Sequence, residues 1–180
     1  DLIELTGGRE AFCKRLDEFF TSDETSGEKN DNASGFVGLY AHGNEPSHHV
    51  AYLYAMAGQP AKTQQLADFI KRTLYNTSSS GYAGNDDCGE MSAWYVFSAL
   101  GFYPVNPASG EYVIGSPTVD RAVVKVGDDK EFVVNVVRKG EPEKAIFVKS
   151  LKLNGRKLDG YSLSHRDIMA GGTLDVVLTA

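Results

Sequence analysis

The sequence is short of the features that mark several large classes of protein. Its longest wholly apolar runs fall far below the roughly 20 residues of a membrane-spanning helix, so we expect no segment that crosses a bilayer. Cys13 and Cys88 are too few for a disulfide framework, which predicts two free thiols or at most one bridge. The first residues lack Met, a basic n-region and an apolar h-region, so no signal peptide is visible and we expect the sequence to begin inside a domain.

Clustered basic residues are missing as well. Against 24 Asp and Glu there are 18 Lys and Arg, and no segment gathers the positive charge that a nucleic-acid backbone or an anionic membrane attracts. No G-x-S-x-G, P-loop or G-x-G-x-x-G motif is present, so acyl transfer and nucleotide chemistry have no support. A hydrophobic content of 42% over 180 residues is enough to bury one large core or two small ones.

The first part of the chain carries apolar residues at helical period. The spacing predicts helices over residues 8–22, 47–57, 60–75 and 90–100, the last of them apolar around most of its circumference and therefore buried on nearly every side. Residues 22–35 are polar and rich in Gly and Asn, which predicts a long loop of functional or mobile character. The apolar stripes are Phe12, Leu16, Phe19 and Phe20 on the first of these helices, and Leu66, Phe69, Ile70 and Leu74 on the third.

The later part of the chain changes to an apolar period of two, in short runs separated by Gly, Asp and Pro. Asn154-Gly155 stands between two alternating arms and predicts a tight hairpin. The change of character near residues 107–110 predicts an α+β chain, with helices over residues 1–107 and an antiparallel β-sandwich-like region over residues 108–180.

Two adjacent carboxylates, Asp86 and Asp87, stand in the glycine-flanked loop "GNDDCG" that leads into the most apolar helix. A single Asp at this place is usually a helix cap, because it accepts from the free amides and meets the positive end of the helix dipole. Only one side chain can occupy the cap, and two like charges so close repel each other. The pair is therefore a candidate for chemistry as well as for capping.

A second polar cluster, "YAHGNEPSHH" over residues 40–49, leads into another helix in the same way. If these helices pack side by side, their leading loops meet at one end and bring Asn44 and Glu45 near the Asp pair. Convergent oxygen ligands suit a hard cation such as calcium. From spacing alone, a turn with a first-turn Glu that complements the helix dipole is the more common explanation of Asn44 and Glu45.

The histidines of this cluster, His42, His48 and His49, invite a zinc interpretation together with Glu45. Neighbouring residues on a helix point about 100° apart, so His48 and His49 cannot both bind one ion, and no H-x-x-x-H pair is present. Zinc is the weaker hypothesis. A histidine here could contact a sugar hydroxyl, or all three could be structural.

Two further residues receive structural interpretations. Trp94 could stack on a sugar, but aromatic residues at helical spacing usually belong to the core, and we assign it there. Cys88 has acidic rather than basic neighbours in sequence, which raises the pKa of a thiol and makes it a poor nucleophile.

Longer blocks of the sequence resemble a known family. "HGNEPSHHVAYLYAMAGQPAKTQ" and "GNDDCGEMSAWYVFSALGFYPVNP" are similar to two signature blocks of the calcium-dependent exo-α-mannosidases of glycoside hydrolase family ninety-two. "SPTVDRAVVKV" and "LKLNGRKLDG" resemble its C-terminal region. The resemblance covers essentially the whole chain, and its two long blocks are specific.

This resemblance implies inverting hydrolysis of α-mannosides in glycans, most often of α-1,2 links. It implies that Asp86 and Asp87 supply the catalytic base, without deciding between them. It implies a Ca²⁺ held by Asn44, with its backbone carbonyl as one candidate ligand, and by Glu45. Substrate contacts are implied for His42, Glu45 and His48.

The resemblance also implies an architecture and a location. Residues 1–107 would be the last helices of an (α/α)6 catalytic barrel, and residues 108–180 the C-terminal β-region. Nothing in the chain is similar to the block that carries the family's general acid, so we expect this sequence to act together with a missing N-terminal domain of the same polypeptide and to be inactive alone. Family members that degrade glycans are exported, which implies a secreted or periplasmic protein.

Two departures and two alternatives stay open. Glu90 and Ser47 differ from the family pattern, which leaves the preferred linkage undecided. The chain could instead be a carbohydrate-binding or structural module in which the acidic loops only cap helices. It could also be a zinc hydrolase that uses His42, His48 or His49 with Glu45, and the metal bound would distinguish the three hypotheses.

Overall fold

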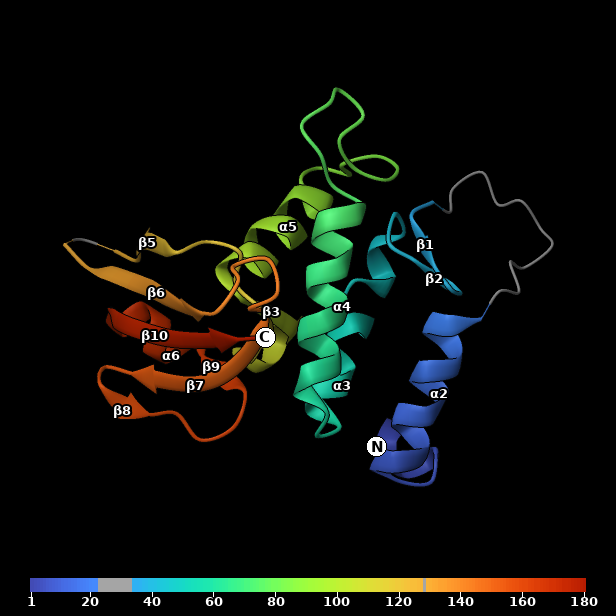
Figure 1. Cartoon of the computed structure of the whole chain (residues 1–180), viewed down its shortest axis with the longest axis horizontal. Helices are drawn as coiled ribbons and strands as arrows, with labels where there is room; N and C mark the ends of the chain where they lie inside the picture. Colours follow the sequence, from blue (N-terminus) through green and yellow to red (C-terminus); the bar gives the residue numbers. More distant parts are fainter. Residues whose placement is uncertain (23–33, 128) are drawn as a thin grey trace.

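The structure is a computed structural model that describes residues 1–22, 34–127 and 129–180. Most of the helices lie on one side of the molecule, and the two larger β-sheets lie on the other (Figure 1). Among the described residues, none of the helices has the length and apolarity needed to cross a membrane. Most of the polar segment predicted as a functional or mobile loop lies outside the described residues.

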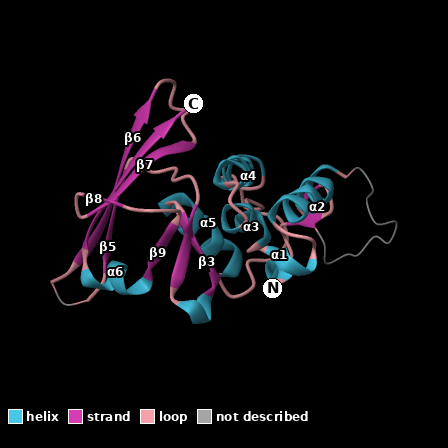
Figure 2. Ribbon diagram, turned by 90° about the horizontal axis from the view of Figure 1, so that it is seen from below, coloured by secondary structure: helices cyan, strands magenta, loops and turns pink. Residues whose placement is uncertain are grey.

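The first part of the chain is helical, as predicted, with a two-stranded hairpin after its second helix. Helix α4 crosses the middle of the molecule, between α2 on one side and the sheets on the other (Figures 1 and 2). The elements are α1 (Leu2–Leu5), α2 (Arg9–Thr21), β1 (Phe36–Val37), β2 (Tyr40–Ala41), the 3-10 turns η1 (Glu45–Ser47) and η2 (Val50–Tyr52), α3 (Leu53–Met56), α4 (Pro60–Thr73) and α5 (Glu90–Leu100).

The predicted core face of α2 is largely confirmed, whereas that of α4 was partly wrong. Helix α2 buries Phe12, Leu16 and Phe20. Helix α4 leaves Phe69 47% exposed and instead buries a face that includes polar side chains. Its apolar side chains join the cluster between the helices, whereas its polar side chains hydrogen-bond to backbone groups of neighbouring segments. The buried residues of α4 are Thr63, Gln64, Ala67, Ile70 and Lys71.

The helix predicted over residues 47–57 is broken into two 3-10 turns and the short α3. Thr63 of α4 supplies the physical reason. Its hydroxyl donates to the carbonyl of Ala51 (2.9 Å) and accepts from the amide of Ala55 (3.0 Å), two groups that a continuous α-helix would join to each other. A tertiary contact therefore replaces a helical hydrogen bond, which a pattern of apolar residues cannot reveal.

Helix α5 ends at Gly101, which adopts the predicted left-handed cap with φ of 95°. The expectation that α5 is buried on nearly every side was wrong, because Val96 is 55% exposed. Trp94 is 1% exposed, which confirms its assignment to the core. Both cysteines are free, as predicted, with Cys13 buried and Cys88 exposed.

The second part of the chain forms two sheets. The three-stranded sheet has the order β3-β4-β9 and is antiparallel, and the five-stranded sheet has the order β5-β6-β10-β7-β8. The elements are β3 (Phe102–Asn106), the 3-10 turn η3 (Pro107–Ser109), β4 (Glu111–Ile114), β5 (Arg121–Lys125), β6 (Glu131–Lys139), β7 (Phe147–Leu153), β8 (Arg156–Lys157), β9 (Ser162–Ser164), α6 (His165–Ala170) and β10 (Gly172–Thr179).

One strand pair corrects the prediction of an antiparallel region. Strand β10 inserts between β6 and β7 and runs parallel to β6, so the larger sheet is mixed. The long connection through α6 allows this, since parallel neighbours need a crossover and not a tight turn. The predicted hairpin at Asn154-Gly155 is confirmed, because Leu153 pairs with Arg156 and both turn residues have positive φ.

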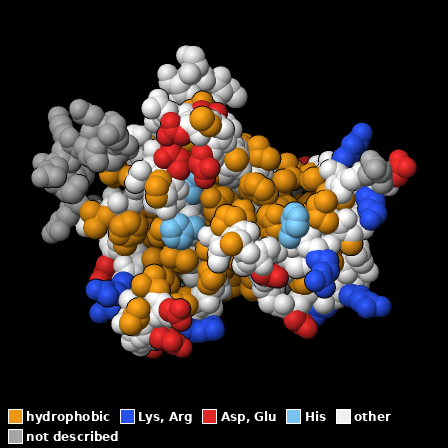
Figure 3. Space-filling view, turned by 180° about the vertical axis from the view of Figure 1, so that it is seen from behind, with side chains coloured by type: hydrophobic (Ala, Val, Ile, Leu, Met, Phe, Trp, Pro, Cys, Tyr) orange, Lys and Arg blue, Asp and Glu red, His pale blue; other side chains and the backbone are white. Residues whose placement is uncertain are grey.

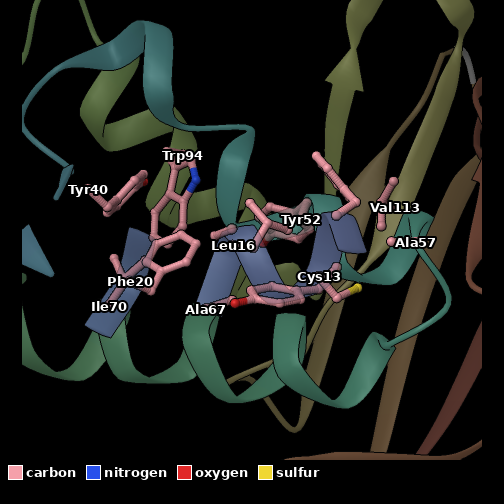
Figure 4. Close-up of a cluster of buried hydrophobic side chains, with 13 residues drawn as sticks. Cys13, Leu16, Phe20, Tyr40, Tyr52, Ala57, Ala67, Ile70, Trp94 and Val113 are labelled. Carbon is pink, nitrogen blue, oxygen red and sulfur yellow. The ribbon is translucent and has the colours of Figure 1, made fainter. Parts of the chain in front are cut away.

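Two hydrophobic clusters form the interior. One joins α2, α3, α4 and α5 around large aromatic side chains, with Phe20, Tyr40 and Trp94 gathered at one end (Figure 4). The other receives Phe102, Ile114 and Leu163 from the small sheet together with side chains of the large sheet. The two sheets therefore share a core, as the layers of a sandwich do.

Lys71 connects the two halves of the molecule. Its side chain is 4% exposed, and its ammonium donates to the carbonyl of Ser98 in the last turn of α5 (3.1 Å) and to that of Ser116, which lies between β4 and β5. A carbonyl near the end of a helix is available for such a cation. Gln64 also connects the two halves of the molecule, because its side-chain oxygen accepts from the amide of Val148 in β7 (3.0 Å).

The buried ammonium predicts a pH dependence of stability. Burial lowers the pKa of Lys71 from 10.5 to about 8. Between these values the unfolded chain holds the proton that the folded chain has released, so the Lys71 contribution to the free energy of unfolding rises with pH and is lost as pH falls to 8. We expect the stability of the wild type relative to Lys71→Met to grow by roughly 2 kcal/mol from pH 7.5 to 10 in denaturant titrations. A difference that stays constant over this range would contradict the assignment, and the variant Lys14→Met, at an exposed lysine, is measured alongside as the control.

Candidate active site

The two polar loops predicted to meet do lie against each other. A methyl group added at Gly84 would lie 3.4 Å from the carbonyl oxygen of Gly43, and one added at Gly43 would lie 3.0 Å from that of Ala83. A side chain at Gly43 would also lie 2.3 Å from the hydroxyl of Ser34, so the close approach requires glycine there. The face seen in Figure 3 carries a close group of acidic side chains next to histidine, above a broad hydrophobic surface.

Asp87 faces Glu45 across this contact. The residues from Asp87 to Gly89 all have left-handed backbone, with φ of 45° at Asp87, 60° at Cys88 and 94° at Gly89. Such a run is uncommon outside glycine and turns the chain sharply. A side-chain hydrogen bond with Glu45 and then the negative charge of Glu45 raise the pKa of Asp87, which is itself exposed. Two carboxyl groups thus share one site.

Asp86 points in another direction and caps α5. Its Oδ1 accepts from the backbone amide of Ser92 (2.9 Å) and from the Ser92 hydroxyl (2.7 Å). The amide of Ser92, in the first turn of α5, has no helical acceptor, so Asp86 satisfies it. The two neighbouring aspartates therefore divide their tasks, because one binds the helix end and the other faces Glu45.

His42 is held from both ring nitrogens and is fully buried. The hydroxyl of Tyr75 donates to the carbonyl of Met91 (3.1 Å), so His42 Nε2 must donate to Tyr75 (2.6 Å). Nδ1 then accepts from the hydroxyl of Tyr40 (2.8 Å). Burial, and next the nearby His48, lower the pKa of His42 to about 3, which keeps the ring neutral.

His48 lies stacked on His42 with ring centroids 4.7 Å apart and is 1% exposed. Its Nε2 donates to the carbonyl of His42 (3.0 Å), which leaves Nδ1 as an acceptor. That Nδ1 is buried, has no hydrogen-bond partner among the described residues, and lies 4.0 Å from a carboxylate oxygen of Glu90. A hydroxyl or water donor placed there would satisfy both acceptors.

The turn that carries Glu45 offers oxygen donors to a metal ion. Oε1 of Glu45 is buried without a hydrogen-bond partner in the described part of the chain. Asn44 is exposed, and its backbone carbonyl already accepts from the amide (3.0 Å) and the hydroxyl (2.6 Å) of Ser47, which leaves its side-chain oxygen as the better candidate ligand. Calcium and not zinc fits an all-oxygen set that includes paired carboxylates.

No three His, Cys, Asp or Glu side chains of the described residues are placed to share an ion. Zinc sites are built from such groups, so the zinc alternative gains no support here. A calcium ion accepts amide, carbonyl and water oxygens as well. Its coordination could therefore be completed beyond the two facing carboxyl groups.

Sequence reasoning missed two residues of this site. Ser92 binds Asp86, and a hydroxyl in the first turn of the helix after an acidic loop is the available signal for that contact. Tyr75 holds His42 from 33 positions away, and only the fold reveals this pairing. Asn44, Glu45 and the Asp pair, which the sequence did predict, come from the two loops that meet.

Comparison with known proteins places this chain in a family. The sequence matches the glycosyl hydrolase family 92 catalytic domain over residues 1–180. It is 41% identical to a GH92 α-mannosidase of Bacteroides thetaiotaomicron solved in complex with mannoimidazole, with a TM-score of 0.87 over 95% of this chain and 22% of that one. A GH92 inverting mannosidase of the same organism is 38% identical, with a TM-score of 0.82 over 98% of this chain and 25% of that one.

A curated relative extends the comparison to fungi. An uncharacterized secreted glycosidase of Arthroderma benhamiae is 31% identical over 178 residues, which are 98% of this chain and 21% of the relative. The chain therefore spans about a fifth to a quarter of the length of these relatives.

The division of tasks between the aspartates predicts different effects on stability. Asp86→Ala removes the acceptor of Ser92 and should lower the free energy of unfolding by about 1 kcal/mol. Asp87→Asn removes a like charge facing Glu45, and Asn tolerates the left-handed backbone, so it should leave the free energy of unfolding unchanged or raise it. Urea titrations at pH 7 measure both. An equal loss in the two variants would show that Asp87 also supports the helix.

Proposed function

This chain belongs to glycosyl hydrolase family 92, and from that premise we propose that it is part of an inverting, calcium-dependent exo-α-mannosidase. The bonds hydrolysed would be α-mannosidic links of mannose-containing glycans, α-1,2 links foremost. The observation that carries the proposal is the meeting of two loops that sets Asp87 opposite Glu45 while Asp86 is bound by Ser92.

The architecture is part of the same proposal. Residues 1–107 would form the last helices of an (α/α)6 barrel, with residues 108–180 as the C-terminal β-region. The general acid and an N-terminal domain would come from elsewhere in the polypeptide, so this stretch alone would be inactive. Export to the periplasm or the exterior is supported by the secreted glycosidase among its relatives.

We assign the base to Asp87 and a positioning role to Asp86. An inverting glycosidase needs one carboxylate to activate water and a second, about 6.5–9.5 Å away, to protonate the leaving oxygen. Asp87 is exposed and can reach a water, whereas the Asp86 oxygen that binds Ser92 fixes the loop on α5. Ser92 would thus orient the base through its neighbour.

Asn44 and Glu45 would hold a calcium ion through side-chain oxygens. The buried Oε1 of Glu45, which has no hydrogen-bond partner within residues 1–22, 34–127 and 129–180, supports this, as does the facing carboxyl of Asp87. When bound, the ion would neutralise the crowded carboxylates and polarise hydroxyls of the sugar. Glu45 would in this way also contact the substrate.

His48 is the better placed of the two histidines for a substrate contact. Its Nδ1 is an acceptor without a partner in the described residues, and a mannose hydroxyl could donate to it. His42 has both nitrogens occupied, so a direct contact with substrate stays a prediction that would require Tyr40 or Tyr75 to move. In the described structure the His42 ring stacks on the His48 ring, and the His42 carbonyl accepts a hydrogen bond from His48 Nε2.

The reaction itself gives the first test. We expect the full-length polypeptide that contains this chain to release mannose from α-1,2-mannobiose, with the β-anomer appearing first in proton NMR, because an inverting enzyme reverses the anomeric configuration. The same experiment with a chelator should show no release, and added calcium should restore it.

Each outcome separates the hypotheses. Full activity after exhaustive chelation would remove the calcium role, and initial formation of the α-anomer would remove inversion. If no α-linked mannobiose is hydrolysed, the carbohydrate-binding or structural module becomes the better proposal.

Variants of the Asp pair test the roles within the site. Asp87→Ala should lower kcat by about 10²–10⁴-fold, because it removes the group that takes the proton from water. Asp86→Ala should lower kcat less, since it only loosens the loop. Asp159→Ala, an exposed acid in the β-region, is the control. Wild-type kcat in both aspartate variants would refute the base assignment, and a larger loss in Asp86→Ala would exchange the two roles.

A further inference from the structure

The two loops of the candidate site meet at a second point, three residues beyond the pair formed by Glu45 and Asp87. On one loop the amide of His48 donates to the carbonyl of Glu45 (3.0 Å). On the other loop the amide of Glu90 donates to the carbonyl of Asp87 (3.3 Å). These two turns set His48 opposite Glu90, with His48 Nδ1 4.0 Å from a carboxylate oxygen of Glu90. The second pair is therefore joined to both carboxyl residues of the first by short backbone turns.

Both atoms that face each other across this gap are hydrogen-bond acceptors. His48 Nε2 donates to the carbonyl of His42 (3.0 Å), so His48 Nδ1 carries a lone pair, and a carboxylate has only acceptors. A separation of 4.0 Å is too long for a direct hydrogen bond. His48 is 1% exposed, and its Nδ1 has no partner in the part of the chain that the structure describes. A buried acceptor in this state is costly, and a donor from a ligand would relieve it.

The width of the gap is fixed by α5. Trp94 lies one turn after Glu90 on this helix, and its indole nitrogen donates to the carbonyl of His48 (3.2 Å). The side chain of Glu90 is 53% exposed, so the gap is open to a ligand on the Glu90 side, while the buried His48 forms its inner wall. The two acceptors are thus positioned before any ligand binds.

A glutamate in the first turn of a helix commonly serves only to complement the helix dipole. That explanation accounts for the place of Glu90 in α5, but it does not account for the buried acceptor that Glu90 faces. Glu10 is an exposed acid in the first turn of α2 and therefore provides a matched control.

We propose that this pair reads two neighbouring free hydroxyls of the sugar that is cleaved, with His48 accepting from one and Glu90 from the other. The inference rests on the proposed function for the identity of that sugar. Neighbouring hydroxyls of a pyranose ring can donate one hydrogen to each of two acceptors. Glu90 is thereby a specificity-determining residue, in addition to the residues assigned to the reaction.

The inference defines the class of sugar that the site accepts. An ether, ester or phosphate at the hydroxyl read by Glu90 has no hydrogen to donate, and its oxygen would face a carboxylate oxygen. A phosphate there would also be repelled by the negative charges of Glu90 and Asp87. Terminal mannose residues that carry a substituent at this position should therefore be rejected through an unpaired acceptor.

The test compares kcat/KM of the full-length protein on an aryl α-mannoside and on each of its monodeoxy derivatives. In the wild type, loss of the hydroxyl read by Glu90 should lower kcat/KM about 100-fold, because a site built to bind a hydroxyl rejects the analogue that lacks it. In Glu90→Ala the same loss should cost about tenfold less, because its acceptor is already gone. Glu10→Ala should keep the wild-type ratio at every position.

Comparing the ratio of deoxy to parent substrate between variants cancels the intrinsic reactivity of each substrate, and a merely structural role of Glu90 would not move it. Equal ratios at every position in the wild type and Glu90→Ala would overturn the proposal. So would wild-type hydrolysis of the derivative methylated at the coupled hydroxyl at the rate of the parent. If Glu90→Ala does not fold, Glu90→Gln decides by the same ratio, since its amide is isosteric and can donate to His48 Nδ1 in place of the sugar.

Hydrolysis of the parent aryl α-mannoside by the wild type tests the proposed function separately. If the wild type does not hydrolyse it, the mannosidase is refuted. The same comparison is then made with Kd values of methyl α-mannoside and its monodeoxy derivatives from calorimetric titration. A deoxy position whose loss of binding depends on Glu90 would retain the pair as a reader of hydroxyls, and no such position would overturn it.

Discussion

The site depends on the way Trp94 joins α5 to the turn that carries Glu45. Its indole is 1% exposed and donates to the carbonyl of His48 (3.2 Å), while its ring packs edge-on against His42 at 4.4 Å. Trp94 also stacks on Tyr75 (5.9 Å), which binds His42 in turn. This buried cluster sets the register between two loops that are about 40 residues apart in sequence, and the meeting of their carboxylates follows from it.

That arrangement brings the carboxyl groups of Asp87 and Glu45 close together, which is electrostatically unfavourable. Asp87 faces Glu45, and the left-handed run that begins at Asp87 adds backbone strain. The hydrogen bonds of Asp86 to Ser92 fix the loop on α5, and the buried His42 and His48 support the turn that carries Glu45. Sites with stored strain and paired acids of this kind are where proteins concentrate their chemistry.

Local patterns in the sequence predicted much of this, and tertiary contacts account for what they missed. The two polar loops, each placed before an apolar segment, correctly predicted that Glu45 lies near the Asp pair. No local pattern could show that Thr63 interrupts the helix over residues 47–57, that β10 inserts beside β6, or that Glu90 faces His48. Each of these arises from partners distant in sequence, where propensity carries no information.

Helix α5 is held at both ends by side chains from outside it. Asp86 binds its first turn, and Lys71 binds a carbonyl of its last turn while also reaching the segment that enters the large sheet. These contacts fix the first turn of the helix to the acidic loop and its last turn to the segment that enters the large sheet. Its amides should open to solvent only when both hydrophobic cores separate, so the two halves of the chain would melt as one cooperative unit even though each has a core of its own.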